Sequence, residues 1–432
     1  MSTGILGAGL TGLTLGNLIA DCEILEKSSE CGGLCQSLEE EGFTFDWGGS
    51  HIIFSKDTAV LDFMLEKLGD NVVKCRRNTK ILYKGNYVKY PFENGLSDLP
   101  LLDNFECLKG FIEALICNNI CNNSPCNFND WLHTTFGDGI AEKYLVPYNE
   151  KIWNYDLSKM GTWWVEGRVP KPPVDDIIKS SLGIETEGYT HQLYFYYPKE
   201  GGINALIKCL ERESKDKLIK KFDVNSIKRD KDGWIVSNGR EKRRYDNIIA
   251  THPIFDLIHS LDDVPAEVYN ALHELKYNSL ITVMLGLSVA QSNDYSWLYI
   301  PDRDCLAHRV AFPSNYSKFV APEGKSAVVA EITYNSSDSV DMLSNDEILS
   351  RTIEELHKRE IINRDTVCFS KAKRTKYAYV IYDLDYEKNM GVIKRFLNER
   401  GIHLVGRFAE FKYLNMDACV RNALDFVKVM RT

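Results

Sequence analysis

Two kinds of hydrophobic pattern alternate along this chain. Short apolar runs, such as residues 22–25, predict buried strands, whereas apolar residues that recur every three or four positions predict amphipathic helices. Leu61, Met64 and Leu68 have helical spacing, and Gly69 follows them as a helix C-cap. The alternation of the two patterns predicts a mixed protein in which helices pack against sheets.

The middle of the chain carries the longest helical stretch. A strand pair at residues 80–83 and 87–90 precedes it. From Leu96 to about Asp176 the pattern is mainly helical, and the prolines of residues 170–173 are expected to end it, because a helix cannot easily continue through proline.

Strand patterns return in the second half. The strands expected there are residues 194–198, 221–224, 234–236, 247–251, 281–285, 327–331 and 403–407. The chain closes with a helix that turns Val420, Ala423 and Val427 inward.

This order predicts an α/β fold in which a Rossmann-like dinucleotide-binding domain is interrupted by two inserted domains. The boundaries expected are residues 1–78, 197–262 and 385–432 for the dinucleotide-binding domain, 95–185 for a helical substrate domain, and 79–94, 186–196 and 263–384 for an antiparallel β-sheet substrate domain.

The first turn of the chain has the G-x-G-x-x-G spacing of dinucleotide-binding folds. Gly7 allows a tight turn, Gly9 lets the backbone approach a pyrophosphate, and Gly12 packs helix against strand. Leu10 and Thr11 open the helix, whose N-terminus presents free N–H groups to phosphate. At the end of the second strand, Glu26 stands where ribose hydroxyls are bound.

Two further glycine loops follow, which favour FAD over NAD. The first contains Gly33 and Leu34, and the second is the run Gly48-Gly49-Ser50-His51. FAD is longer than NAD at the flavin end and requires close backbone approach along its diphosphate and ribityl chain. Each loop taken singly is also compatible with an ordinary turn.

Composition narrows the class of protein. The chain has 432 residues and a net charge of −9, which argues against nucleic acid as a partner. No apolar run reaches the length of a membrane span, and the fingerprint begins too close to Met1 to leave room for a signal peptide. We therefore expect a cytoplasmic protein.

The twelve cysteines are scattered, as expected for reduced thiols. Cys107, Cys117, Cys121 and Cys126 form a loose cluster, but the C-x2-C pairs of structural zinc sites are missing. We predict no metal site.

Aromatic residues gather beside arginines in several segments. They occur at residues 147–153, followed by Arg168; at residues 297–301, followed by Arg309; and at residues 377–382 and 406–413. Such groups suit a ligand that bears a stacking ring and a phosphate. Core aromatics with surface arginines are the alternative interpretation, and the pattern alone does not separate the two.

In order along the chain, several motifs resemble those of the eukaryotic-type UDP-galactopyranose mutases, flavoenzymes related to protoporphyrinogen oxidases and amine oxidases. The matching segments are Gly32-Gly33-Leu34, Tyr90-Pro91-Phe92, Pro147 through Trp153, Glu166 through Val169, Trp297 through Pro301, Ser314 through Ser317, and Gly406 through Tyr413.

The resemblance implies a role for each matching residue. Arg168 and Arg309 would clamp the substrate diphosphate, and His51 would lie at the flavin near N5; these three are the expected catalytic residues. The expected cofactor-binding residues are Gly7, Gly9, Leu10, Thr11, Gly12, Glu26, Lys27, Gly33, Leu34, Gly48, Gly49, Ser50, His51, Val224, Arg407, Met416 and Asp417. The expected substrate-binding residues are Tyr90, Glu93, Asn149, Trp153, Arg168, Trp297, Tyr299, Arg309, Tyr379 and Tyr413.

The resemblance also implies a reaction. Reduced flavin N5 would attack the anomeric carbon of the sugar and expel UDP, and the resulting flavin–sugar adduct would open and reclose as a furanose. NADPH or NADH is the reductant that the family leads us to expect. An FAD-dependent oxidase or dehydrogenase of the protoporphyrinogen oxidase or amine oxidase type is the alternative, and a flavin-binding protein with a structural role is a third.

Two positions depart from the family pattern. Glu93 replaces a glutamine that recognises the base, and a carboxylate lacks the donor of an amide. Ser50 is inserted between the glycines and His51, so that either Ser50 or His51 would face flavin N5. The sugar, the base and the oligomeric state stay open.

Overall fold

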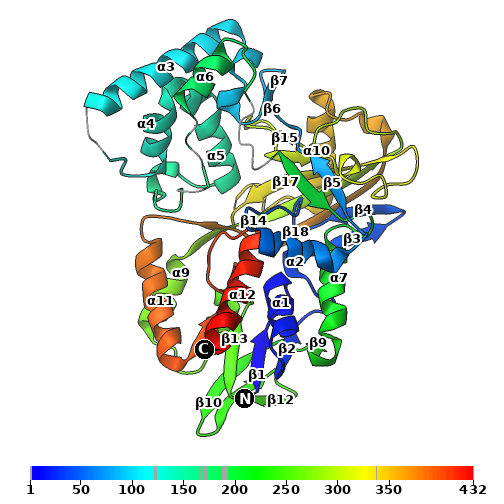
Figure 1. The fold of residues 1–432 in the computed structure, drawn as a ribbon, viewed down its shortest axis with the longest axis vertical. Coiled ribbons are helices and arrows are strands. Elements are labelled where there is room, and N and C mark those ends of the chain that lie inside the picture. Colours follow the sequence, from blue (N-terminus) through cyan, green and yellow to red (C-terminus); the bar gives the residue numbers. More distant parts are fainter. Residues whose placement is uncertain are drawn as a thin grey trace.

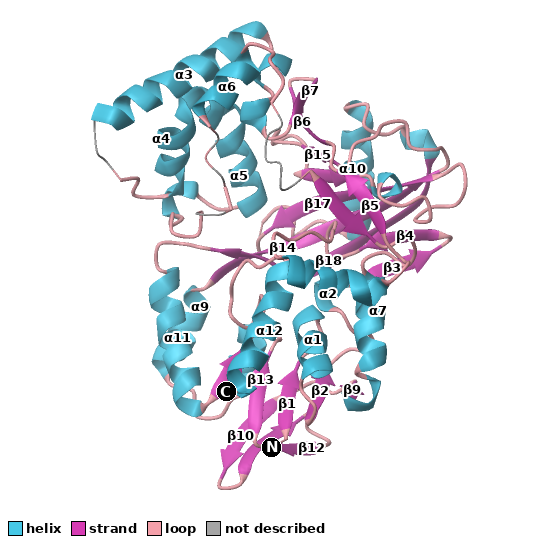
Figure 2. Ribbon diagram, in the orientation of Figure 1, coloured by secondary structure: helices cyan, strands magenta, loops and turns pink. Residues whose placement is uncertain are grey.

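The computed structural model describes residues 2–120, 124–165, 168–169, 171, 173–186, 193–336 and 338–431. Figure 1 shows a parallel sheet flanked by helices at one end of the molecule, a group of helices at the other end, and an antiparallel sheet beside the junction. In Figure 2 the strands concentrate in the two sheets, whereas the far end is helical. The fold is therefore mixed α/β, as predicted.

The parallel sheet has the order β19-β13-β1-β2-β9. Its strands are β1 (Thr3–Leu6), β2 (Cys22–Glu26), β9 (Leu218–Lys220), β13 (Asn247–Ala250) and β19 (Ile402–Leu404). They come from three distant parts of the chain, so the sheet brings the two ends of the sequence together with its middle. The domain boundaries themselves stay predictions.

Helices and a small sheet surround these strands. The helices are α1 (Leu10–Leu18), α2 (Thr58–Leu68), α7 (Asn204–Glu213), α8 (Ile254–Ser260), α9 (Ala266–Glu274), α11 (Tyr386–Arg400) and α12 (Met416–Arg431). The small antiparallel sheet consists of β10 (Ser226–Asp230), β11 (Gly233–Ser237) and β12 (Lys242–Tyr245). Ile5, Ile24 and Ile249 are fully buried beneath the helices, which makes the sheet the core of this part of the molecule.

The helical group contains α3 (Leu101–Ile120), α4 (Phe128–Ile140), a π-helical turn over Ala141–Leu145, α5 (Val146–Trp153) and α6 (Val174–Ser181). The π-helical turn joins α4 to α5 without a break. Since π-helical turns often accompany functional residues, we expect α5 to contribute to a functional site.

The antiparallel sheet has the order β18-β14-β17-β16-β15-β6-β7. Its strands are β6 (Thr79–Tyr83), β7 (Asn86–Lys89), β14 (Lys276–Leu287), β15 (Trp297–Tyr299), β16 (Arg309–Ala311), β17 (Ser326–Tyr334) and β18 (Val367–Ile381), and α10 (Asn345–Lys358) contacts β18. Two strand pairs complete the fold: β3 (Ser37–Glu40) with β4 (Phe43–Asp46), and β5 (Val73–Arg76) with β8 (Tyr194–Tyr197).

The strand predicted at residues 221–224 is wrong. The strand there is β9, which ends at Lys220, because Lys221 has a positive φ of 58° and turns the chain away from the sheet. Residues 222–225 then run outside the sheet, which places Val224 at a cavity described below.

The expectation that the prolines of residues 170–173 end the helical region is also wrong. Pro173 is the N-cap of α6, which continues to Ser181. Proline is well tolerated at the start of a helix, where its missing N–H has no partner to lose. Glu166, Gly167, Pro170 and Pro172 lie outside the described residues.

Within the described ranges, no helix is long and apolar enough to cross a membrane. In that same part of the chain, no three histidine, cysteine or acidic side chains gather closely enough to hold a metal ion, and Cys121 lies outside it.

Candidate functional site

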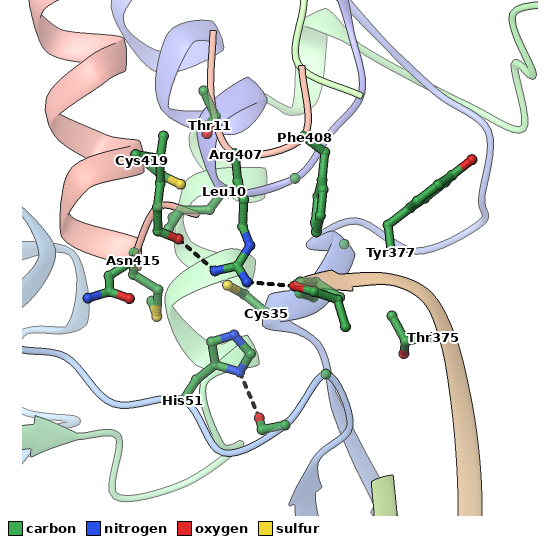
Figure 3. Close-up of a pocket in the computed structure, with 18 of the residues that line it drawn as sticks. Leu10, Thr11, Cys35, His51, Thr375, Tyr377, Arg407, Phe408, Asn415 and Cys419 are labelled. Atoms are coloured by element: carbon green, nitrogen blue, oxygen red, sulfur yellow. Dashed lines mark hydrogen bonds between the residues drawn. The ribbon is translucent and has the colours of Figure 1, made fainter. Parts of the chain in front are cut away.

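A cavity of about 1650 Å³ lies between the parallel sheet, the antiparallel sheet and α5. Its wall combines the turns after β1 and β2, the loop of residues 47–57, the inner side of β18, and residues 407–421 at the start of α12. Figure 3 shows side chains from these segments pointing toward one another, with Arg407 between the α1 and α12 side and the His51 loop.

The glycines of the fingerprint have three different surroundings. Gly7 has φ +104°, which side chains rarely adopt. A Cβ on Gly12 would lie 1.9 Å from the Gly7 carbonyl oxygen, so Gly12 permits α1 to pack on β1. A Cβ on Gly9 would meet nothing within 4 Å. Gly9 lines the cavity at the N-terminus of α1, so its backbone is open to a ligand.

Glu26 closes this end of the cavity. One carboxylate oxygen accepts the Ala8 N–H at 2.8 Å, and the other accepts the Ser28 N–H at 2.9 Å. The carboxylate is therefore held in place at the end of β2. Lys27 and Val224 line the cavity beside it.

The loop from Gly48 to His51 is fixed by contacts with the Leu34 backbone and the Trp297 side chain. A Cβ on Gly48 would lie 2.2 Å from the Leu34 carbonyl oxygen, and Gly49 has φ +94°. The Ser50 hydroxyl accepts the Trp297 indole N–H at 3.2 Å. Ser50 is thus tied to the wall.

His51 points into the cavity (Figure 3). Its Nδ1 lies 2.7 Å from the Gly49 carbonyl oxygen, which can only accept, so Nδ1 carries the proton and Nε2 is an acceptor. Burial lowers the pKa of His51 to about 4, so the ring is neutral at ordinary pH.

A buried carboxylate couples this loop to Arg309. Glu331 on β17 is fully buried and accepts Arg309 Nε at 3.0 Å and Arg309 Nη2 at 2.6 Å. It also accepts the Ser50 N–H at 3.0 Å. Arg309 is therefore already oriented by a bidentate ion pair, and Glu331 raises the pKa of Arg309 despite its burial.

Two more arginines approach the same place from other elements. The Arg168 guanidinium lies 4.6 Å from the Tyr413 ring centre, and burial lowers the pKa of Arg168. Arg407 lies 4.4 Å from the same ring and donates to the carbonyl oxygens of Leu414 and Ala378 (Figure 3). In the part of the chain that the structure describes, no carboxylate forms an ion pair with Arg168 or Arg407. They hold positive charge available to an anion.

Tyrosine and tryptophan rings link these arginines. The ring centres of Tyr379 and Tyr413 are 5.5 Å apart, and those of Trp153 and Tyr413 are 5.8 Å apart. The Trp153 indole N–H donates to the Asn149 side chain at 3.1 Å. Since Asn149 and Trp153 both lie on α5, that helix supplies one wall of the cavity.

A second aromatic group lies at the β6 and β15 end. The ring centres of Tyr90 and Tyr299 are 5.2 Å apart. Arg77 lies 4.9 Å from the Tyr90 ring and 5.3 Å from the Trp297 ring, and it lines the cavity. This end offers flat rings together with a cation.

Most of the predicted site residues come together in this one cavity. Those that line it are Gly7, Gly9, Leu10, Thr11, Glu26, Lys27, Gly33, Leu34, Gly48, Gly49, Ser50, His51, Tyr90, Asn149, Trp153, Arg168, Val224, Trp297, Tyr299, Arg309, Tyr379, Arg407, Tyr413, Met416 and Asp417. Gly12 packs behind the wall. Glu93 is 3% exposed and is not among the residues that line the cavity.

Sequence reasoning missed Glu331 and Arg77. Glu331 had a detectable signal, because a charge in the apolar run Ala327-Val328-Val329-Ala330 requires a buried partner. Arg77 had none, since it becomes notable only where β6 and β15 place Tyr90 and Trp297 around it.

The geometry fits a dinucleotide cofactor together with a second ligand. The parallel sheet presents a helix N-terminus and an open glycine backbone, and the three arginines lie beyond that cradle toward α5. This arrangement is typical of flavoproteins that combine an FAD-binding Rossmann-like sheet with an antiparallel substrate sheet.

The chain belongs to the flavin containing amine oxidoreductase family, whose model matches residues 11–365. It is therefore a flavin-dependent enzyme of that superfamily.

Among solved structures, the chain is similar to a reduced UDP-galactopyranose mutase, with a TM-score of 0.90 and 24% identity over 100% of this chain and 93% of the other. It is also similar to a putative protoporphyrinogen oxidase from Exiguobacterium sp. 255-15, with a TM-score of 0.78 and 17% identity over 99% and 98%. A putrescine oxidase bound to putrescine matches with a TM-score of 0.70 and 15% identity over 100% and 98%. At these identities the matches establish the fold.

Proposed function

We propose that this protein interconverts the pyranose and furanose forms of a nucleotide sugar, with UDP-galactopyranose and UDP-galactofuranose as the first candidates. The observation that carries the proposal is the convergence of Arg168, Arg309 and Arg407 with Tyr379 and Tyr413 in one cavity. An amine substrate has no negatively charged group for these three arginines to bind. A diphosphate has such a group.

The remaining wall has a place for the other parts of such a substrate. The rings of Tyr90 and Tyr299 offer a stacking surface for a base, and Arg77 supplies a donor there. We infer that Arg77, rather than the glutamine amide that this chain replaces with Glu93, is the cation nearest to a base stacked there.

When bound and reduced, FAD supplies a nucleophilic nitrogen in place of a nucleophilic side chain. The chain's own residues then bind, orient and stabilise. Arg168 and Arg309 offset the charge of the departing diphosphate, and they are positioned before the reaction by Tyr413 and Glu331. His51, neutral with Nε2 as an acceptor, would accept a hydrogen bond at the flavin end of the cavity.

The test is chromatography of UDP-galactofuranose after incubation with anaerobic, dithionite-reduced protein. We expect conversion to the pyranose with reduced flavin and none with oxidised flavin. NADPH and NADH are compared as physiological reductants in the same assay. A panel of other nucleotide sugars tests the choice of base and sugar, and unchanged UDP-galactofuranose would refute that substrate.

A peroxide assay addresses the alternative. Protein with oxidised flavin is mixed with putrescine or protoporphyrinogen in air, and hydrogen peroxide is measured. Turnover with peroxide release, without isomerisation of any nucleotide sugar, would replace the proposal with an oxidase. That the protein works in the cytoplasm stays a prediction.

A further inference from the structure

A buried carboxylate lies behind the loop that carries Ser50 and His51. Asp46 is the last residue of β4, it is 4% exposed, and it is not among the residues that line the cavity. Among the residues that the structure describes, no lysine, arginine or histidine forms an ion pair with it. A buried carboxylate without a cation is costly unless other groups donate hydrogen bonds to it, so its donors are the first thing to identify.

Neutral donors from four segments surround this carboxylate. The Ser37 hydroxyl on β3 donates to Oδ1 at 2.7 Å, and the N–H of Ile203, the N-cap of α7, donates to the same oxygen at 2.9 Å. The Tyr197 hydroxyl on β8 donates to Oδ2 at 2.9 Å. The His51 backbone N–H also approaches the carboxylate. Asp46 therefore ties the loop to β3, to β8 and to the start of α7.

The backbone around Asp46 leaves room for these contacts. Gly202 has φ +58°, and a Cβ on it would lie 2.7 Å from Asp46 Oδ1, so glycine is required there. At the other end of the loop, Ile53 and Tyr196 exchange two backbone hydrogen bonds, at 2.9 and 2.7 Å. Since Tyr196 and Tyr197 both belong to β8, the loop is attached to that strand at both ends.

Two different carboxylates hold consecutive N–H groups of the loop. The Ser50 N–H donates to Glu331, whose charge is balanced by Arg309. The next N–H along the chain, that of His51, approaches Asp46. A protonated Asp46 would have to donate its own hydrogen, and the backbone N–H groups around it cannot accept one. The hold of Asp46 on the loop therefore depends on its negative charge.

The charge of Asp46 changes in an accessible pH range. Burial raises its pKa to about 6, although the hydrogen-bond donors oppose the rise. Burial also raises the pKa values of the other titratable side chains that feel this charge, which are Cys35, Tyr197 and Tyr316. The pKa of His51 is lowered to about 4, and the pair of Glu39 on β3 with Lys208 on α7 is exposed. Of these groups, Asp46 is the one that titrates near pH 6.

We propose that Asp46 is a positioning residue for the flavin: its ionised carboxylate holds residues 47–51 in the conformation that the bound cofactor requires, and its protonation releases them. The inference concerns the cofactor loop, so it is independent of the proposed sugar substrate. It gives this flavoprotein a cofactor site that loosens in acid.

A pH titration of the holoenzyme with oxidised flavin tests this proposal. The visible absorbance and the fluorescence of the bound flavin are recorded between about pH 8 and pH 5 at constant ionic strength. We expect a transition with a midpoint near pH 6 in the wild type and no transition in Asp46→Asn. Below the midpoint, the dissociation constant of FAD should rise by up to about tenfold per pH unit in the wild type, as linkage to one proton allows, and stay constant in the variant.

Tyr197→Phe distinguishes a positioning role from a merely structural one. The variant keeps the ring but removes one donor to the carboxylate, so the pKa of Asp46 should rise. The midpoint should move up by about one pH unit, the size of one hydrogen bond to a charged group.

Asp383→Asn is the matched control. Asp383 is 9% exposed, burial raises its pKa as well, and it is not among the residues that line the cavity. This variant should keep the wild-type transition.

Three results would overturn the proposal. They are a wild-type flavin signal that stays constant over the whole pH range, a transition that persists in Asp46→Asn, and a Tyr197→Phe midpoint at or below that of the wild type. If Asp46→Asn gives no soluble protein, the direction of the Tyr197→Phe shift decides the question.

Discussion

Replacing Glu331 by glutamine tests how the cavity is organised. The change keeps the size of the side chain and an oxygen for the Ser50 N–H, but it removes the only negative charge that the structure pairs with Arg309 in the described residues. Breaking a buried ion pair costs about 3–5 kcal/mol, and the retained oxygen places Glu331→Gln near the lower end. The entropy of unfolding is about 2.1 cal/mol/K per residue, so the 432-residue chain should lose about 3 °C in Tm.

The ligand response should move in the opposite direction. In Glu331→Gln, the Arg309 guanidinium has no negatively charged partner among the described residues until a diphosphate binds. UDP should therefore raise the Tm of Glu331→Gln by more than it raises the Tm of the wild type, because part of the lost electrostatic energy returns on binding. Thermal scans of the flavin-loaded protein, with and without saturating UDP, measure both effects.

Glu355→Gln is the matched control. Glu355 on α10 is 9% exposed and accepts the Leu306 N–H at 2.6 Å and Arg351 Nε at 2.7 Å, so it also pairs one arginine and one backbone donor. It is not among the residues that line the cavity, and its loss should leave the UDP response unchanged. A Glu331→Gln protein with wild-type Tm and wild-type UDP response would refute this account of Arg309.

Substitutions at four single positions give further predictions. Gly9→Ala should fold with an unchanged Tm but retain less flavin, because the added methyl enters the cavity. The ratio of absorbance at 450 nm to that at 280 nm measures the retained flavin. Gly12→Ala should fail to give soluble protein, since its Cβ would lie 1.9 Å from a backbone oxygen. The Lys151 ammonium donates to three backbone carbonyl oxygens that join α5 to the β15–β16 connection, and burial lowers its pKa to about 8. The unfolded chain therefore holds this proton more tightly, so the Tm difference between wild type and Lys151→Met should shift in favour of the wild type from pH 8 to about 10.5; a difference independent of pH would contradict it. The fold lowers the pKa of His51 to about 4, so between about pH 6.5 and 4 the unfolded chain binds this proton more tightly than the folded protein does. The contribution of His51 to stability is therefore present above about pH 6.5 and is lost as the pH falls toward 4. Acid titrations of Tm should show a steeper fall for the wild type than for His51→Gln, and equal slopes would count against a neutral His51 ring in the folded protein.

Elements defined by neighbouring residues were predictable from the sequence. The strand–turn–helix from Thr3 to Leu18 follows from local spacing, because the glycines, the helix start and the apolar run all act within a few residues of one another. The strand that the sequence analysis misplaced also depends on a local feature. The strand expected at residues 221–224 lay three positions too late, since the pattern does not reveal the positive φ at Lys221.

Tertiary structure alone decided what Arg309 does. The family resemblance presents Arg309 as a ligand of the substrate diphosphate. The structure adds that β16 and β17 pair so that Arg309 meets Glu331, 22 residues away, and that Glu331 meets Ser50, 281 residues away. Such contacts depend on strand register and on the packing of distant segments, which no local pattern encodes. The sequence by itself determined the glycine turns of the dinucleotide fold and the inventory of arginines and aromatics, whereas the fold determined that Arg309 is paired with Glu331 and that Arg168, Arg309 and Arg407 share one cavity with those turns.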